Sequence, residues 1–298
     1  MQITAVSIQG SSPLNEDALI RNDAAQLFGV IDGASSLIPY KRPSGETGGY
    51  LAAQITADYF NERSGSDIAE GAHGLLEAFE AVNAQLREQM IESGVSLERK
   101  EDLWSACGAV VRVKPRWIEF AQLGDCMIAV YYMDGTIRIV TQDQVAHVDD
   151  RSKAVWAQGI AEGITAGDQL RHYVLPQIIS GRSLANSPGG YSVLNGDPHF
   201  ADYAEYGRIS RTNVRALLLF SDGLYVPKPA GISDKDGAVE VASLVQEKGV
   251  LPFIQWLTEL EESDPDGLQF PRMKRSDDKS AIWIELKQEQ EQEQEQED

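Results

Sequence analysis

Two short apolar runs, far apart in the chain, each lead into an acid followed by a glycine. The first run ends at Asp32-Gly33 and the second at Asp222-Gly223. An apolar run of this length that stops at Asp-Gly predicts a buried strand ending in a turn. Each strand would hold its carboxylate on a rigid base, and the glycine would let the backbone approach a ligand closely. We therefore expect two strand ends, 190 positions apart, to meet in one site built by the fold.

The segment of residues 104–140 constrains the topology further. It reads as four strands, at 104–113, 117–123, 126–133 and 136–140, with the turns Lys114-Pro115, Gly124-Asp125 and Asp134-Gly135 between them. An Asp-Gly pair between apolar strands is a strong signal for a hairpin. Consecutive hairpins predict an antiparallel meander, which differs from the parallel sheet of a dinucleotide-binding fold.

Hydrophobic periodicity predicts the other elements on both sides of this segment. We expect strands at 3–8, 17–21, 26–31, 214–220 and 280–286, and helices at 46–63, 67–92, 154–162, 167–179, 238–248 and 251–261. The helix at 67–92 is expected to begin at a Ser66-Asp67 cap. Residues 150–210 are the least regular part of the chain.

Composition indicates a globular protein with one large core. The chain has 298 residues, of which 42% are hydrophobic, so residues 1–286 are expected to form one domain. Residues 287–298 repeat Glu and Gln, cannot bury a core, and are expected to be disordered. The first residues alternate like a strand rather than a signal peptide, and no apolar run is long enough to span a membrane. Cys107 and Cys126 lie in apolar segments, so we expect them to be reduced and buried in a cytoplasmic protein.

The formal net charge of −20 argues against two classes of partner. A nucleic-acid binder must neutralise phosphates with Lys and Arg, and an anionic membrane surface would repel this chain. Acids that cluster in a site would instead attract divalent cations. Solubility alone is the simplest interpretation of most of the charge.

Several acids stand at the ends of the expected elements, beside apolar strands. They are Glu16, Asp17, Asp32, Asp125, Asp222, Asp277 and Asp278. Clustered carboxylates repel one another unless they hold protons or cations, and their oxygens suit hard ions such as Mg²⁺ or Mn²⁺. Each acid also has a structural interpretation, because Asp-Gly is foremost a turn dipeptide and paired acids can protect a sheet edge. The sequence has no zinc-type spacing of His and Cys, no GxxxxGK[ST] loop and no GxSxG elbow.

In order along the chain, five motifs resemble those of the protein phosphatase 2C (PP2C, PPM) family of metal-dependent serine/threonine protein phosphatases. They are Asn15-Glu16-Asp17, Val30-Ile31-Asp32-Gly33, Leu123-Gly124-Asp125-Cys126, Leu218 to Leu224, and Asp278 to Ile284. The resemblance covers residues 15–284 and indicates a divergent member of the bacterial type. It implies an α+β fold, a four-layer αββα sandwich with two packed antiparallel sheets flanked by helices.

The resemblance also implies a role for each matched position. Asp32 would bridge two Mg²⁺ or Mn²⁺ ions, the Gly33 carbonyl would bind the first ion, and Asp222 and Asp278 would bind the second. Asp32, Asp222 and Asp278 would thus act in catalysis through metal-bound water, which attacks phosphorus with no phosphoenzyme. The implied substrate is a phosphorylated protein, and the implied opposing partner is a serine/threonine kinase.

Three further acids would take supporting roles in such a site. Glu16 and Asp17 would act through metal-bound water or behind the direct ligands, and Asp125 would help to hold a weaker third ion.

Some positions depart from the family pattern and leave alternatives open. Ala34-Ser35-Ser36 stands where relatives often place a histidine, Val226 stands where an aspartate is common, and Lys279 follows Asp278 where asparagine is usual. The segment before Asn15 also lacks a phosphate-binding arginine. A pseudophosphatase that uses the fold as a regulatory binding module is therefore one alternative. A different carboxylate-metal hydrolase, such as a nuclease, is another, which the acidic surface and the order of the motifs disfavour.

Overall fold

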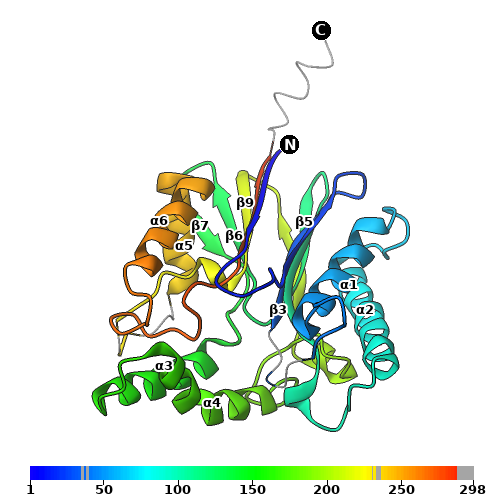
Figure 1. Ribbon diagram of the computed structural model, residues 1–298. Coiled ribbons are helices and arrows are strands. Elements are labelled where there is room, and N and C mark those ends of the chain that lie inside the picture. The colour runs from blue at the N-terminus through cyan, green and yellow to red at the C-terminus, as the bar shows by residue number, and fades with distance from the viewer. Residues whose placement is uncertain (35–36, 38–39, 230, 233–235, 287–298) are drawn as a thin grey trace.

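The computed structural model describes residues 1–34, 37, 40–229, 231–232 and 236–286, and within them the chain folds around two antiparallel sheets of five strands (Figure 1). In spatial order, the first sheet consists of β1 (Gln2–Ile8), β10 (Lys279–Glu285), β9 (Val214–Phe220), β6 (Met127–Tyr132) and β7 (Ile137–Ile139). The second consists of β2 (Asp17–Asn22), β3 (Leu27–Ala34), β4 (Ser105–Val113), β5 (Trp117–Leu123) and β8 (Glu205–Ser210).

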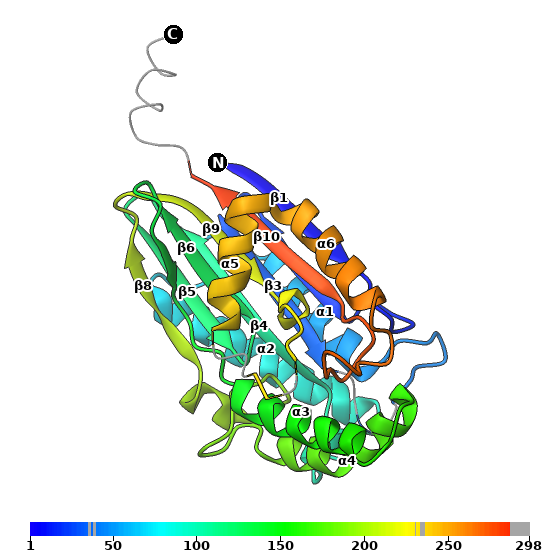
Figure 2. The same cartoon turned by 90° about the vertical axis from the view of Figure 1, so that its left-hand side faces the viewer.

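Helices cover the outer face of each sheet. Helices α1 (Gly48–Glu62) and α2 (Ala72–Glu92) pack on the second sheet, and α5 (Gly237–Lys248) and α6 (Val250–Glu262) pack on the first. Helices α3 (Ala146–Ala161) and α4 (Gly167–Ser183) pack against each other across one end of the sandwich (Figures 1 and 2). This arrangement confirms the expected four-layer α+β fold.

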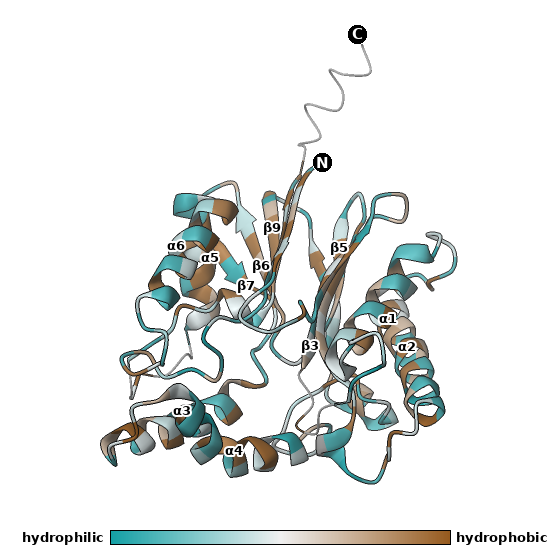
Figure 3. Cartoon of the chain, in the orientation of Figure 1, coloured by the Kyte–Doolittle hydropathy of each residue, from teal (hydrophilic) through white to brown (hydrophobic). Residues whose placement is uncertain are grey.

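The central strands are buried on both faces, because the inner face meets the other sheet and the outer face meets helices. In β4, Ala106 and Val110 pack toward α1 and α2, whereas Val111 and Val113 pack between the sheets. This alternation follows from the two-residue period of a strand. Figure 3 accordingly shows hydrophobic residues along the strands and hydrophilic residues on outward turns of the helices.

The expected meander over residues 104–140 is wrong at one turn. Strands β4 and β5 pair with each other, and β6 pairs with β7 through the predicted Asp134-Gly135 hairpin. Between them, Gly124-Asp125 carries the chain from one sheet to the other. Gly124 has φ +71°, and a Cβ there would lie 2.2 Å from the Cys107 sulfur. The chain therefore crosses between sheets where only glycine fits, and it leaves Asp125 at the crossing.

The helix expected at 67–92 starts later, at Ala72. The carbonyls of Ile68, Ala69 and Gly71 accept hydrogen bonds from the Arg112 guanidinium. These carbonyls are thereby withdrawn from helical bonding, and Gly71 adopts φ +91°, outside the helical region. A long-range contact with an arginine on β4 therefore overrides the local cap signal.

Other boundaries differ in ways that matter for the site. β3 does not stop before Asp32 but continues to Ala34, with Asp32 paired to Cys107. β8 was not expected, because its sequence is polar and half of its residues are exposed along an edge. α3 begins eight residues before the predicted start at 154, and α4 ends at Ser183, four residues beyond the predicted end at 179.

The remaining expectations concern the cysteines, membrane-spanning segments and the acidic tail. Both cysteines are free and buried, as predicted. No helix in the described ranges is long and apolar enough to cross a membrane. The expected disordered tail, 287–298, lies outside the described residues, as do Ser35 and Ser36.

Candidate metal centre

The acids meet where the strand ends of both sheets come together. In the second sheet, Asp17 at the start of β2 pairs with Asp32 on β3. In the first sheet, the Ser221 N–H donates to the Ser280 carbonyl at 3.0 Å, so the end of β9 lies beside the start of β10. This contact brings Asp222, which follows β9, next to Asp277, which precedes β10.

A serine hydroxyl joins the two sheets at this point. Ser221 Oγ donates to Asp17 Oδ2 at 3.0 Å and accepts the Ser280 N–H at 3.1 Å. Because Ser221 and Ser280 are fully buried, these bonds also satisfy polar groups that water cannot reach. The hydroxyl therefore fixes the spacing between the acids of one sheet and those of the other.

These strand ends open onto a cavity of about 590 Å³. Five carboxylates line it: Asp32, Asp125, Asp149, Asp222 and Asp277. Apolar side chains such as Val148 on α3 and Ile178 on α4 form another part of its wall. The structure therefore brings three of the predicted acids, Asp32, Asp125 and Asp222, to one cavity.

Burial and mutual repulsion make these carboxyls hard to ionise. Burial, opposed by hydrogen bonds from serines, raises the pKa of Asp17 to about 8. Burial first, and then the charges of Asp17 and Asp222, raise the pKa of Asp32 well above its usual range. Burial likewise raises the pKa of Asp125 and of Asp222, with a further contribution from neighbouring acids. In the absence of cations, the cluster would hold protons at neutral pH.

One basic side chain stands among these acids. Lys274 Nζ lies 2.5 Å from Asp277 Oδ1, and Lys274 lines the same cavity. Burial alone would lower the pKa of Lys274, but the charges of Asp277 and Asp32 raise it above its ordinary value. Lys274 is therefore a cation at this site, and its single charge cannot balance five carboxylates.

The structure places Asp278 away from the cavity, which corrects the expectation that it lies there with Asp32 and Asp222. Its side chain is 3% exposed, Oδ1 accepts the Gly10 N–H at 2.7 Å, and Oδ2 accepts the Glu16 N–H at 2.8 Å. Asp278 therefore anchors the segment that precedes β2. Its neighbour Asp277 lines the cavity instead.

Glu16 and Gly33 have structural roles in this arrangement. The Glu16 carboxylate accepts a hydrogen bond from the Thr47 hydroxyl, which also caps α1, and the Glu16 carbonyl accepts the Gly33 N–H at 3.1 Å. A Cβ on Gly33 would lie 2.2 Å from the Gly49 carbonyl oxygen, so α1 can approach β3 only because residue 33 is glycine. Neither residue is among those that line the cavity.

Cys107 and Val226 lie near these acids, and the structure gives each of them a role in packing rather than in chemistry. The Cys107 thiol lies beside Asp125 and Asp32, and burial and these charges raise its pKa, which argues against a nucleophilic thiolate. Val226 is buried against α5 and α6, so this position serves the hydrophobic core.

The carboxylate oxygens of the cavity suit small divalent cations such as Mg²⁺ and Mn²⁺, which prefer oxygen ligands. Within the described ranges, no three His, Cys, Asp or Glu side chains converge closely enough to enclose one ion. Mg²⁺, however, keeps several waters and commonly binds proteins through one or two carboxylates. The negative charge of Asp222 raises the pKa of Asp32, so the two carboxyls lie close enough to repel each other, and a cation could relieve that repulsion.

Sequence reasoning missed Asp277 and Lys274 as residues of this cavity. Asp277 and Asp278 precede the same strand, and the sequence alone does not show which of them faces the cavity. Lys274 lies in an irregular segment with no periodicity to orient it. The one available signal was the Asp277-Asp278 pair itself.

Comparison with known proteins places this geometry in a family. The family described as Protein phosphatase 2C matches residues 7–269, while no curated protein sequence matches the chain significantly. The structure is similar to the serine/threonine phosphatase Stp1 from Staphylococcus aureus, with 18% identity, a TM-score of 0.58, and coverage of 96% of this chain and 95% of that one. It is also similar to the Mycobacterium tuberculosis serine/threonine phosphatase PstP/Ppp, with 20% identity, a TM-score of 0.54, and coverage of 96% of this chain and 99% of that one.

A third similar structure is a PstP catalytic domain in complex with two manganese ions, with 16% identity, a TM-score of 0.54, and coverage of 95% of this chain and 97% of that one. At these identities, the three structures show a shared fold. Since the family match spans most of the chain, and the two-sheet fold agrees with it, the chain belongs to the protein phosphatase 2C family of protein serine/threonine phosphatases.

Proposed function

We propose that the chain hydrolyses phosphoserine and phosphothreonine in proteins and that its activity requires Mg²⁺ or Mn²⁺. The observation that carries the proposal is the cavity lined by five carboxylates. Burial and repulsion oppose the ionisation of Asp32, Asp125 and Asp222 unless cations are bound. The family membership supplies the reaction class. The two manganese ions in the PstP complex support a centre with two ions.

Asp32, Asp222 and Asp277 are the residues that we propose as direct metal ligands. Asp277 takes the place first expected for Asp278, because Asp277 lines the cavity and both oxygens of Asp278 accept backbone hydrogen bonds. We propose that Asp125, which lies where the chain crosses between the sheets and lines the cavity, helps to hold a weaker third ion.

Bound divalent cations would supply an activated water and positive charge for the phosphoryl oxygens. The protein's own residues fix where that chemistry occurs. Ser221 holds Asp17 at a set distance behind Asp32, and Asp278 ties residues 10–16 to the start of β10. Glu16 and Gly33 are proposed to support the site through α1 and β3 rather than by contact with an ion.

The proposed substrate is a phosphorylated protein, with a serine/threonine kinase acting in opposition. The two free cysteines favour a reducing compartment, so we place the activity in the cytoplasm.

The test is hydrolysis of a phosphothreonine peptide with and without Mn²⁺, beside two variants. Asp32→Asn should lower turnover by at least about 100-fold, as expected when a group that positions charge at a reacting centre is lost. Asp58→Asn changes an exposed acid on α1 and should leave turnover unchanged. Near-normal turnover of Asp32→Asn at saturating Mn²⁺ would show that Asp32 is not a ligand. Absence of turnover in the wild type would favour the pseudophosphatase alternative.

A further inference from the structure

We infer that Lys274 binds the phosphate group of the substrate in the acid-lined cavity. This inference rests on the phosphatase activity proposed above and assigns the cavity a residue that recognises the substrate. It starts from the position of the side chain. Lys274 lines the cavity together with Asp32, Asp222 and Asp277, and its Nζ lies 2.5 Å from Asp277 Oδ1. The side chain is 23% exposed, so the ammonium can still be reached by a ligand.

The backbone that carries Lys274 is held on both sides. Before it, Arg272 donates to Asp264 Oδ2 at 3.1 Å, and Arg171 on α4 donates to the Met273 carbonyl at 2.6 Å. After it, the Ser11 N–H donates to the Ser276 carbonyl at 2.8 Å. The segment itself lies outside regular secondary structure, yet these bonds connect it to the turn after α6, to α4 and to the link before β2. The lysine is therefore presented to the cavity from a fixed base, which reduces the entropy lost when it binds a ligand.

The charge balance of the cavity indicates what Lys274 binds. A phosphate monoester carries nearly two negative charges at neutral pH, and it must enter a cavity lined by five carboxylates. A cation held by Asp277 would compete with Lys274 for that carboxylate. The ammonium would then need another anionic acceptor, which the substrate phosphate supplies through charge-assisted hydrogen bonds.

Two arginines also line the cavity but are less suited to this role. Arg171 donates to the Met273 carbonyl, as described, and the charge of Arg182 acts on the hydroxyl of Tyr191. Lys274 is the basic residue whose charge acts directly on Asp277, Asp32 and Asp222.

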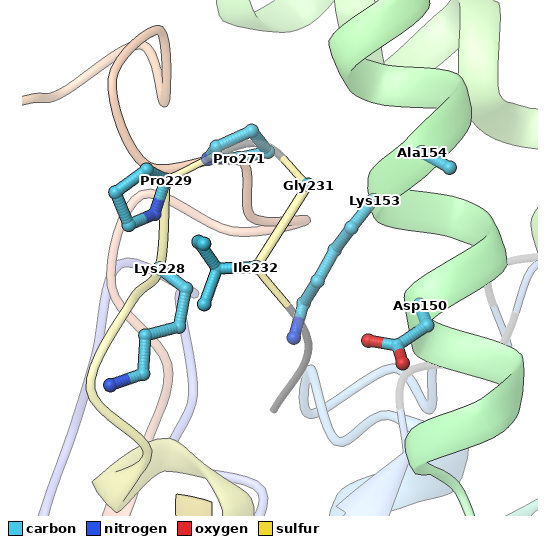
Figure 4. A pocket seen from close by; sticks show the side chains of 8 residues that line it. All are labelled: Asp150, Lys153, Ala154, Lys228, Pro229, Gly231, Ile232 and Pro271. Atoms are coloured by element: carbon cyan, nitrogen blue, oxygen red, sulfur yellow. The ribbon is translucent and has the colours of Figure 1, made fainter. Parts of the chain in front are cut away.

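Lys228 provides a matched control. Its side chain is also 23% exposed and is also ion-paired, in its case with Glu240. It lines a neighbouring pocket of about 200 Å³ together with Lys153, Pro229 and Ile232 (Figure 4). It also lines a smaller pocket of about 120 Å³ with Asp222, Asp277 and Lys274, but it is not among the residues that line the acid-lined cavity. Lys228→Met removes the same charge from a similar setting, so it measures the effect of the general electrostatic field without the proposed contact.

The experiment compares wild type, Lys274→Met, Lys274→Arg and Lys228→Met. Hydrolysis of p-nitrophenyl phosphate at saturating Mn²⁺ gives KM and kcat, and calorimetric titration with inorganic phosphate gives Kd without any need for turnover. Lys274→Met should raise both KM and Kd about tenfold, the order expected for one charge-assisted hydrogen bond. Lys274→Arg should recover most of the affinity, and Lys228→Met should stay within about twofold of the wild type, since it removes charge without the contact.

Three results would overturn the inference. One is an unchanged Kd for phosphate in Lys274→Met, provided that the melting temperature shows this variant to be folded. If Lys274→Met does not fold, Lys274→Gln takes its place in the same measurement. A second is an equal loss in Lys228→Met, which would indicate a long-range field. A third is activation of Lys274→Met at lower Mn²⁺ with an unchanged Kd, which would make Lys274 an internal counter-ion. Phosphate binding that depends on Lys274 in a wild type without turnover would instead refute only the proposed phosphatase activity.

Discussion

Two groups of buried charge lie along strand β4, and they differ in how they are balanced. Near the end of the strand, Arg112 and Glu119 are 1% and 2% exposed and form an ion pair with 2.6 Å between Nε and Oε2. Arg112 also donates to the carbonyls that precede α2. Near the start of the strand, Cys107 lies beside Asp32 and Asp125, which face further acids across the cavity. The first group is fully paired, whereas the second has an excess of negative charge.

The difference separates a role in stability from a role in binding. A fully paired charge group needs nothing from outside, and removal of one partner leaves the other buried and uncompensated. A group with excess charge of one sign is stable only with protons or with a bound cation. The acids of the cavity are therefore the part of the interior where a ligand, rather than the chain itself, completes the electrostatics.

The largest effect that we predict comes from breaking the paired group. Arg112→Met should destabilise the fold by about 3–5 kcal/mol, because Glu119 would remain buried without its partner. The measurement is the free energy of unfolding from urea denaturation. The double variant with Glu119→Gln should recover a large part of the loss, and failure to do so would mean that the pair is not the source of the effect.

Asp17, which is buried behind the acids of the cavity, should respond to pH in the opposite way from ordinary surface acids. The pKa of Asp17 is raised from 3.8 to about 8 in the folded protein, so between these values the native state binds a proton that the unfolded state does not. Stability without metal should therefore fall as pH rises from about 4 to about 8, by up to about 1.4 kcal/mol per pH unit for each such group. Urea denaturation in EDTA at several pH values measures this slope. A slope that stays the same in Asp17→Asn would contradict the assignment.

Metal binding should remove much of this penalty. A ligand that binds only the native state stabilises it by about 2.7 kcal/mol at a hundredfold excess over its dissociation constant. Mn²⁺ should therefore raise the melting temperature in a concentration-dependent way, and Asp222→Ala should weaken the rise. Na⁺ at matched ionic strength controls for screening of the −20 net charge. If Na⁺ reproduces the shift, the cavity does not bind metal.

The smallest effect concerns the acidic tail. Removal of Gln288 to Asp298 should leave the melting temperature and turnover nearly unchanged, because this segment has no apolar residue to pack. A loss of several degrees would instead show that the tail docks on the domain.

Local patterns in the sequence predicted the parts of this protein that depend on local structure. The apolar runs before Asp32 and Asp222 correctly indicated buried strands, and the helix pairs followed from periodicity. The sheet crossing at Gly124 could not be predicted in this way, because the turn there looks like a hairpin until the space near Cys107 is known. The late start of α2 depends on Arg112, about 40 positions away along the chain.

The choice between Asp277 and Asp278 shows the same limit within the site. Adjacent residues at a strand end point in different directions, and only the tertiary contacts decide which direction leads to the cavity. Here the N–H groups of Gly10 and Glu16 bind the Asp278 carboxylate. Those donors come from the other end of the chain, so no local pattern contains them.

The pairing of β1 with β10 also determines when the cavity can form. Ile8 pairs with Lys279, so the first strand has its partner only after nearly the whole chain has been synthesised. Contacts between such distant segments form late and slow the folding of a domain. Asp277 immediately precedes β10, so a growing chain would hold the acids of β2 and β3 in place before their counterparts arrive. A ribosome-bound chain that stops before Asp277 would therefore hold the other acids of the cavity but lack both Asp277 and the partner of β1, so its cavity would be incomplete.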